Sequence, residues 1–328
     1  MRIKYFVLFL LIFHLSACNN AVESPYEPIQ FKSFAPMAGN GRSSAVAFAV
    51  NGKGYVALGR DANRKALKDC WEYNPTDNSW LEKSSFPGDG RVNAMSAVLD
   101  GKAFVGLGFD PRYGVYSDIK AYLRDFWMYN TEIDTWTKKD SFPSTATDAC
   151  VSFVYKNNIY VGGGFNGWGF VTEFWKYSIS NDAWIRLKDF PGMGRAGGIL
   201  CASDEHIFYG TGYRTLNEND WWEYFPETDT WAKRKAMPDN GRENGVSFTI
   251  NNRYFVSTGR QFGGNMTGGH VKSDIKEYDA TRDVWYERGS IPTDARENAI
   301  GFSINGKGYI GFGENDTQVL NDFWSFEP

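Results

Sequence analysis

The fold is decided by a short stretch at residues 125–142, which reads DFWMYNTEIDTWTKKDSF. In this stretch Tyr129 stands seven residues before Trp136, and Trp136 stands six residues before Phe142. The same spacings recur in four other segments, at Tyr73 and Trp80, Tyr177 and Trp184, Tyr224 and Trp231, and Tyr278 and Trp285. Spacings that stay constant over five segments indicate an internal repeat, which must be identified before any other feature of the fold.

Each repeat has further fixed positions. In the second unit Arg91 is followed thirteen residues later by Phe104 and four residues after that by Gly108, and the other units keep these offsets. Pairs such as Asp100-Gly101 are typical of tight hairpin turns. We therefore expect four strands in this unit, at residues 91–100, 102–108, 125–129 and 136–141. A repeat of 47–56 residues with four strands predicts one β-propeller blade.

The two ends of the chain predict how the ring closes. The last unit starts at Arg296 and ends after residues 322–326 (DFWSF), before a fourth strand could form. At the other end Phe31, Met37 and Arg42 keep the spacings of that missing fourth strand. The sequence thus predicts an all-β fold, a six-bladed propeller with four antiparallel strands per blade, in which the N-terminal strand completes the last blade. Closure of the ring removes exposed sheet edges.

Composition limits the classes of partner. The 328 residues carry a net charge of −4, and 17% of them are aromatic. This composition excludes a disordered chain and gives no basic surface for nucleic acid. We expect a monomer with no nucleic-acid partner and no cofactor.

The N-terminus resembles a bacterial lipoprotein signal. Arg2 and Lys4 precede an apolar run over residues 5–15, which ends in Leu-Ser-Ala-Cys at residues 15–18. A basic start, a short apolar core and small residues before a cleavage point are typical of a secretory signal. We expect a signal peptide at 1–17, a lipidated Cys18 with a tether at 18–30, and the propeller at 31–328. An ordinary signal cleaved nearby is the alternative.

These features predict a protein of the bacterial cell envelope, on the outer membrane, whose lipid is its only contact with the membrane. Cys70, Cys150 and Cys201 match no metal-site spacing, and we expect no metal. Buried thiols are the expected state of these three cysteines, and one disulfide with a free thiol is the alternative.

Over residues 31–328 the repeat resembles the Kelch repeat, in its bacterial lipoprotein form. The resemblance rests on the aromatic residue and glycine of the second strand and on the Tyr and Trp at fixed spacing. Two features depart from the family pattern. Only Gly163-Gly164 forms the usual glycine pair, and Lys276 stands where the other five blades have Trp71, Trp127, Trp175, Trp222 and Trp324.

One face of the propeller is the expected binding face. Strand direction places two sets of loops on the same face: those that precede each first strand and those that follow each second strand. We call it face one. Long loops at 109–124 and 260–273 lie on this face, and long loops on a rigid scaffold commonly carry function. The predicted ligand-binding residues on this face are Arg42, Arg91, Arg195, Arg242, Arg296, Arg60, Arg260, Phe109, Phe165 and Tyr213. Guanidinium groups bind carboxylates through paired hydrogen bonds, and Thr147 completes the ring of first-strand positions.

The alternative is that the repeated arginines are architectural, paired with acids such as Glu243 or Glu297 or with loop carbonyls. The repeated Tyr and Trp are expected to form the core between blades. Four aromatic residues fall outside the repeat pattern in loops of face one and are further candidates for ligand contact: Tyr113, Tyr116, Trp168 and Phe262.

These residues predict a non-catalytic binding module for a carbohydrate, an anionic ligand or a protein partner. The alternative is an enzyme similar to the sialic-acid mutarotases, which share this type of propeller. Such an enzyme needs an acid, a base and an arginine, and Glu243, Glu297, Glu314, His270 and the arginines could supply them. A copper site like that of galactose oxidase needs two histidines close together. The mature chain has only His206 and His270, which the repeat places on opposite faces. The sequence singles out no catalytic residue.

Overall fold

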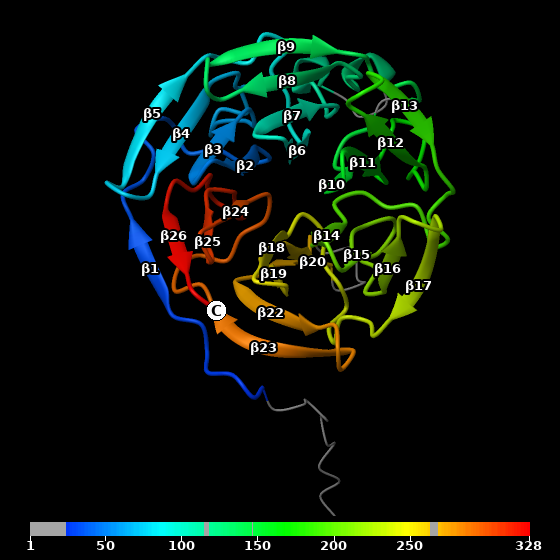
Figure 1. The fold of residues 1–328 in the computed structure, drawn as a ribbon. Helices are drawn as coiled ribbons and strands as arrows, with labels where there is room; N and C mark the ends of the chain where they lie inside the picture. The colour runs from blue at the N-terminus through cyan, green and yellow to red at the C-terminus, as the bar shows by residue number, and fades with distance from the viewer. Residues whose placement is uncertain (1–23, 115–117, 146, 263–267) are drawn as a thin grey trace, which may run out of the picture.

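Six four-stranded antiparallel sheets surround a central axis (Figure 1), so the predicted all-β, six-bladed propeller is confirmed. The computed structural model describes residues 24–114, 118–145, 147–262 and 268–328. In every blade the first strand lies at the axis and the fourth at the rim.

The strands of the first three blades follow one another along the chain. Blade 1 contains β2 (Val46–Val50), β3 (Lys53–Ala57), β4 (Cys70–Asn74) and β5 (Ser79–Lys83). Blade 2 contains β6 (Met95–Leu99), β7 (Lys102–Gly106), β8 (Phe126–Asn130) and β9 (Thr135–Lys139). Blade 3 contains β10 (Val151–Tyr155), β11 (Asn158–Gly162), β12 (Phe174–Ser178) and β13 (Ala183–Arg186).

Of the remaining three blades, one has an extra two-stranded hairpin in its loop and one is completed by the N-terminal strand. Blade 4 contains β14 (Ile199–Ala202), β15 (Ile207–Gly210), β16 (Trp221–Phe225) and β17 (Thr230–Arg234). Blade 5 contains β18 (Val246–Ile250), β19 (Arg253–Ser257), β22 (Asp274–Asp279) and β23 (Val284–Ser290), and its loop forms the hairpin of β20 (Arg260–Gln261) and β21 (His270–Val271). Blade 6 contains β24 (Ile300–Ile304), β25 (Lys307–Gly311), β26 (Phe323–Phe326) and β1 (Phe31–Phe34). Two 3-10 turns, η1 (Pro111–Tyr113) and η2 (Ile119–Ala121), lie in the long loop of blade 2.

The N-terminal strand closes the ring, as predicted. Strand β1 pairs antiparallel with β26, with Phe31 opposite Phe326 and Phe34 opposite Phe323. The first and last residues of the propeller therefore share one sheet. Strand β26 therefore has a hydrogen-bonded partner on its outer side.

The first strand of each blade is shorter than predicted. In blade 2 it begins at Met95 rather than at Arg91. The reason is that Val92 forms an isolated bridge with Phe109 and that Asn93 has a φ of +54°, which breaks the extended conformation. The three other strands of this blade lie within two residues of their predicted positions.

The repeated aromatic residues form the core between blades, as expected. Tyr129 of blade 2 is fully buried in a cluster with Val46, Phe48 and Tyr55 of blade 1. Its ring stacks on Trp136 with the centroids 4.5 Å apart, and its hydroxyl donates to Asp134 at 2.6 Å. Five blades bury such a Tyr–Trp pair against a neighbour, and blade 6 has Phe326 and Phe31 in its place. This apolar burial stabilises the ring.

Cys70 and Cys201 are buried and Cys150 is half-buried, and all three are free thiols. Burial raises the pKa of each thiol to about 12. Within the described residues, no helix has the length and apolar character that a transmembrane span requires.

Candidate functional site

The five repeated arginines lie inside the blades rather than on the surface. Each is at most 1% exposed. In blade 2 the guanidinium of Arg91 donates to both carboxylate oxygens of Asp125, at 2.7 and 2.9 Å, and to the carbonyl of Leu107 at 3.0 Å. The same contacts recur in four other pairs: Arg42 with Asp69, Arg195 with Asp220, Arg242 with Asp274, and Arg296 with Asp322. A buried guanidinium has no surface for a ligand, so these contacts favour the architectural alternative.

A sequence signal for these partners exists, although the sequence analysis did not use it. In five blades an acidic residue stands two positions before the third-strand tryptophan. In blade 5 an acidic residue stands two positions before Lys276, which replaces the tryptophan. The tryptophan indole also donates to this carboxylate, as Trp127 does to Asp125 at 2.7 Å. Arginine, acid and tryptophan therefore form one repeated unit. In blade 3, Thr147 and Glu173 stand at the positions of the arginine and the aspartate.

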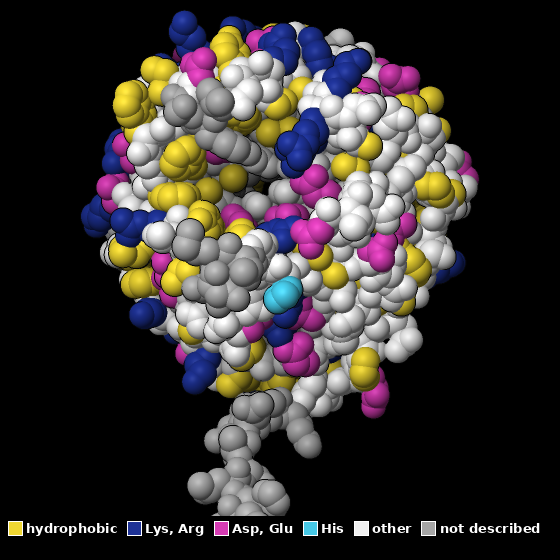
Figure 2. Space-filling view, turned by 180° about the vertical axis from the view of Figure 1, so that it is seen from behind, with side chains coloured by type: hydrophobic (Ala, Val, Ile, Leu, Met, Phe, Trp, Pro, Cys, Tyr) yellow, Lys and Arg dark blue, Asp and Glu magenta, His cyan; other side chains and the backbone are white. Residues whose placement is uncertain are grey.

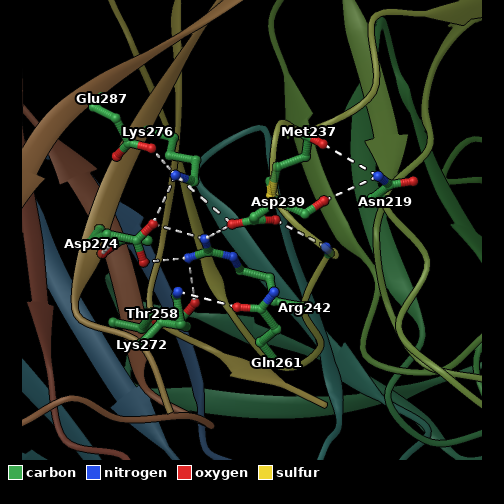
Figure 3. Close-up of polar contacts among 12 residues, drawn as sticks. Asn219, Met237, Asp239, Arg242, Thr258, Gln261, Lys272, Asp274, Lys276 and Glu287 are labelled. Atoms are coloured by element: carbon green, nitrogen blue, oxygen red, sulfur yellow. Dashed lines mark hydrogen bonds and ion pairs between the residues drawn. The ribbon is translucent and has the colours of Figure 1, made fainter. Parts of the chain in front are cut away.

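Lys276 takes over the donor role of the missing tryptophan in blade 5 (Figure 3). Its ammonium lies 3.1 Å from Asp274 and also contacts Asp239 and Glu287. Arg242 donates to Asp274 and Asp239 in the same cluster. Burial alone would raise the pKa of Asp274, but Arg242 and Lys276 hold it at about 2. Lysine in place of tryptophan therefore still supplies a donor to Asp274, and the contact found in the other blades is kept.

A ring of backbone hydrogen bonds surrounds the axis on face one. Its members lie two residues after the first-strand Arg or Thr, all have positive φ, and we call them the floor ring: Ser44, Asn93, Ala149, Gly197, Asn244 and Asn298. Each donates its N–H to the carbonyl of the preceding member, over 2.9–3.1 Å, and Ser44 closes the ring by donating to Asn298. The floor ring lines a central cavity of about 130 Å³.

The residues just before the floor ring pair with the residues that follow each second-strand glycine. Isolated bridges join Ser43 to Arg60, Val92 to Phe109, Asp148 to Phe165, Ala196 to Tyr213, Glu243 to Arg260, and Glu297 to Glu314. The glycine is required for this approach. A Cβ at Gly108, whose φ is +90°, would lie 2.7 Å from the carbonyl oxygen of Val92. The structure thus brings Arg60, Phe109, Phe165, Tyr213 and Arg260 together around the floor ring, on the face where they were predicted.

Charged side chains concentrate in one half of this wall, and we call them the charged half: Arg60, Glu243, Arg260, Glu297 and Glu314, from blades 1, 5 and 6. Asp148 of blade 3 stands at a wall position in the other half, where it is buried and accepts a hydrogen bond from Asn93. Three ion pairs link the blades of the charged half. Arg60 binds Glu314 at 2.7 Å, and Arg260 binds Glu297 at 2.7 Å and Asp316 at 2.6 Å. Among the nitrogens of Arg60, Nη1 has no hydrogen-bond partner among the described residues, and the side chain is 26% exposed.

Glu243 differs from the other carboxylates of the charged half. Its backbone pairs with Arg260, but its side-chain carboxyl forms no hydrogen bond or ion pair with the part of the chain that the structure describes. Burial, and then the charge of Glu297, raise its pKa to about 8, although Arg260 opposes the shift. Burial and the charge of Glu314 also raise the pKa of Glu297, which Arg260 counters. Glu243 is therefore mostly protonated at neutral pH, beside a carboxylate that is held in an ion pair.

Aromatic side chains occupy the other half, and we call them the aromatic arc: Phe109, Tyr122, Phe165, Phe170, Tyr213 and Phe262. Consecutive members are in contact, with ring centroids 5.1–6.1 Å apart. Phe109 and Tyr122 are buried, whereas Phe165, Phe170, Tyr213 and Phe262 are half-buried. Figure 2 shows this face with a hollow at its centre, hydrophobic side chains on one side of it and charged side chains on the other.

The other candidates are placed as follows. Trp168 and Tyr113 are exposed in loops of face one, and Phe262 joins the aromatic arc. Tyr116 and Cys18 lie outside the described residues. His206 lies in the β14–β15 turn, on the face opposite His270 in β21. No group of three or more metal-binding side chains occurs within the described residues.

The fold and the repeated unit define a six-bladed β-propeller. Residues 148–191 match the Kelch motif. The solved structure of YjhT is similar over 88% of this chain and 95% of its own, with a TM-score of 0.75 and 18% identity. At this identity the likeness concerns the fold.

Two curated relatives match a short segment. The N-acetylneuraminate epimerase of Pasteurella multocida (strain Pm70) is 38% identical over 63 residues, 18% of this chain and 17% of the enzyme. That of Haemophilus influenzae (strain PittEE) is 40% identical over 57 residues, 16% of this chain and 15% of the enzyme. The matched segment therefore spans less than a fifth of either relative.

Proposed function

We propose that this chain binds an acidic sugar of the sialic-acid class over the floor ring. The observation that carries the proposal is the division of one concave wall into a charged half and an aromatic arc. A sugar acid presents a carboxylate, hydroxyl groups and an apolar ring face, and such a wall offers each of them a partner. The short similarity to N-acetylneuraminate epimerases supports this choice of ligand.

Arg60 is the residue that we expect to bind the sugar carboxylate. Its Nη1 atom has no partner among the described residues, whereas each side-chain nitrogen of Arg260 already donates to Glu297, Gly268 or Asp316. An arginine with open donors can bind a carboxylate through two hydrogen bonds.

The test is calorimetric titration of the protein with N-acetylneuraminate. We expect binding by the unmodified protein and at least a tenfold loss of affinity in Arg60→Ala. Lys307→Ala is the matched control, because Lys307 is an exposed cation at the β24–β25 turn on the opposite face. No binding, or an equal loss in both variants, would refute the proposal.

Anomer exchange is a second candidate function, and Glu243 is the observation that favours it. Opening a sugar ring breaks the bond between the anomeric carbon and the ring oxygen. It needs one proton donated to that oxygen and one removed from the anomeric hydroxyl, and reclosure reverses both transfers. Glu243, protonated at neutral pH, can donate, and Glu297 can accept.

Magnetisation-transfer NMR on N-acetylneuraminate measures this exchange directly. We expect the protein to accelerate it, and Glu243→Gln to abolish the acceleration while N-acetylneuraminate still binds. Binding without acceleration by the unmodified protein would leave a non-catalytic binding module.

Lipid attachment at Cys18, and with it a location in the bacterial envelope, belongs to the same proposal and is supported by the sequence pattern alone. Metabolic labelling with a fatty acid tests it. We expect label on the unmodified protein and none on Cys18→Ala, and label on both proteins would refute it.

A further inference from the structure

The aromatic arc is longer than one sugar ring needs. A pyranose ring is about the size of one phenyl ring, so a monosaccharide covers one or two members of the arc. The arc has six members in unbroken contact, contributed by blades 2, 3, 4 and 5. Four of them are only half-buried. This leaves apolar surface beyond what the proposed acidic sugar would cover.

The loops around the arc extend this surface outward. Trp168, in the loop between Phe165 and Phe170, is 78% exposed. Its position is fixed by Asn166, whose side-chain oxygen accepts the N–H groups of Trp168 and Gly169 at 3.0 and 2.9 Å. Leu216 and Met193 are also exposed in neighbouring loops. Together these three side chains add exposed apolar surface to the loops around the arc.

Polar groups beside the rings favour a saccharide over a purely apolar occupant. The hydroxyl of Tyr213 has no hydrogen-bond partner among the described residues. The amide nitrogen of Asn217, which bridges to Tyr213 through the backbone, is buried and likewise has no described partner. Sugars present apolar ring faces with hydroxyl groups at their edges, which aromatic rings with polar groups beside them complement.

We propose that the aromatic arc and Trp168 form an extended subsite for the neutral sugar units of a glycan whose acidic unit lies in the charged half. The ligand class is therefore an oligosaccharide with an acidic terminal residue, and the free acidic monosaccharide occupies only the charged half. This inference rests on the proposed function for the acidic unit, while the subsite itself takes neutral sugars.

Calorimetry with three probes separates the two claims. The probes are N-acetylneuraminate, the trisaccharide in which it is linked to lactose, and a neutral β-linked glucose tetrasaccharide. We expect the trisaccharide to bind at least tenfold more tightly than the monosaccharide. We expect Trp168→Ala to remove that gain and to leave monosaccharide affinity unchanged. Ile133→Ala is the matched control, because Ile133 is 66% exposed in the β8–β9 turn on the opposite face.

Each outcome decides one claim. If the monosaccharide binds but the trisaccharide binds no more tightly, the extended subsite is refuted and the proposed function stands. If the monosaccharide does not bind but the tetrasaccharide binds and loses affinity in Trp168→Ala, the subsite stands and the acidic-sugar proposal falls. If no saccharide binds, both are refuted and a protein partner becomes the candidate occupant.

Discussion

Two parallel hydrogen bonds, of 2.7 and 2.9 Å, join Arg91 to Asp125, so that the segments just before the first and third strands of blade 2 are held together. Arg91 is fully buried, and its Nη1 also binds the carbonyl of Leu107, a residue with a φ of +58°. The pair therefore holds the loop that follows the second strand in the conformation from which Phe109 projects. Its role in ligand binding is indirect, since it positions the wall of the hollow.

The first prediction is that Arg91→Met lowers the free energy of unfolding by about 3–5 kcal/mol. The reason is that the variant leaves the Asp125 carboxylate without its main partner in a largely buried site. Urea unfolding measures the change. The exposed pair Lys307–Glu327 provides the control, and Lys307→Ala should cost less than about 1 kcal/mol. If Arg91→Met unfolds at the same urea concentration as the unmodified protein, the architectural role is wrong.

The second prediction concerns the lysine of blade 5. Lys276→Trp should keep stability within about 1 kcal/mol, because an indole N–H can donate to Asp274 as tryptophans do in other blades. Lys276→Met has no donor, and should cost about 1–3 kcal/mol. Thermal unfolding of the two variants measures the difference. Equal stability of Trp and Met at this position would show that the donor to Asp274 does not matter.

Most of the fold was predictable because the repeat fixes it. Tyr129, Trp136 and Gly108 recur at constant offsets, and each offset reflects a position in the blade that only certain residue types satisfy. The closure by β1 followed from counting the strands of the last unit. The start of the first strand was not predictable from hydrophobic pattern, because a positive φ at Asn93 interrupts it.

The face on which the candidate residues lie was predictable from the sequence, but their burial and mutual contacts were not predicted. Strand direction placed Arg60, Phe165 and Tyr213 on one face, where the structure has them. The burial of Arg91 was missed because its partner Asp125 lies 34 residues away in the sequence, although the repeated acid two positions before the third-strand tryptophan was a signal for it. The aromatic arc was also hidden, because Tyr122 and Phe170 belong to loops of unequal length that meet only in the folded ring.

The third prediction tests closure of the ring. Deletion through Phe34 removes β1 and leaves the edge of β26 unpaired, so we expect self-association and a less cooperative unfolding transition. Light scattering and urea unfolding measure the two effects. Deletion only through Gln30 keeps β1 but loses the buried side chain of Ile29, and should cost about 1–3 kcal/mol without association. A monomeric, cooperative protein without β1 would show that closure is not needed.

The fourth prediction is a pH dependence of stability that belongs to Glu243. Its pKa is about 8 in the folded protein and about 4.3 in an unfolded chain, so between these values the folded state binds the extra proton. Stability from this group is therefore greatest at low pH and declines as the pH rises from about 4 to about 8. Glu243→Gln cannot lose this proton, and its melting temperature relative to the unmodified protein should rise steadily between pH 5 and pH 8.

Glu132→Gln is the control for this measurement, because Glu132 is exposed in the β8–β9 turn, and its difference should stay flat. A flat difference for Glu243→Gln as well would mean that Glu243 is ionised at neutral pH in the folded protein. It could then not act as the proton donor in anomer exchange. The same carboxyl thus links a stability measurement, which needs no ligand, to the second candidate function.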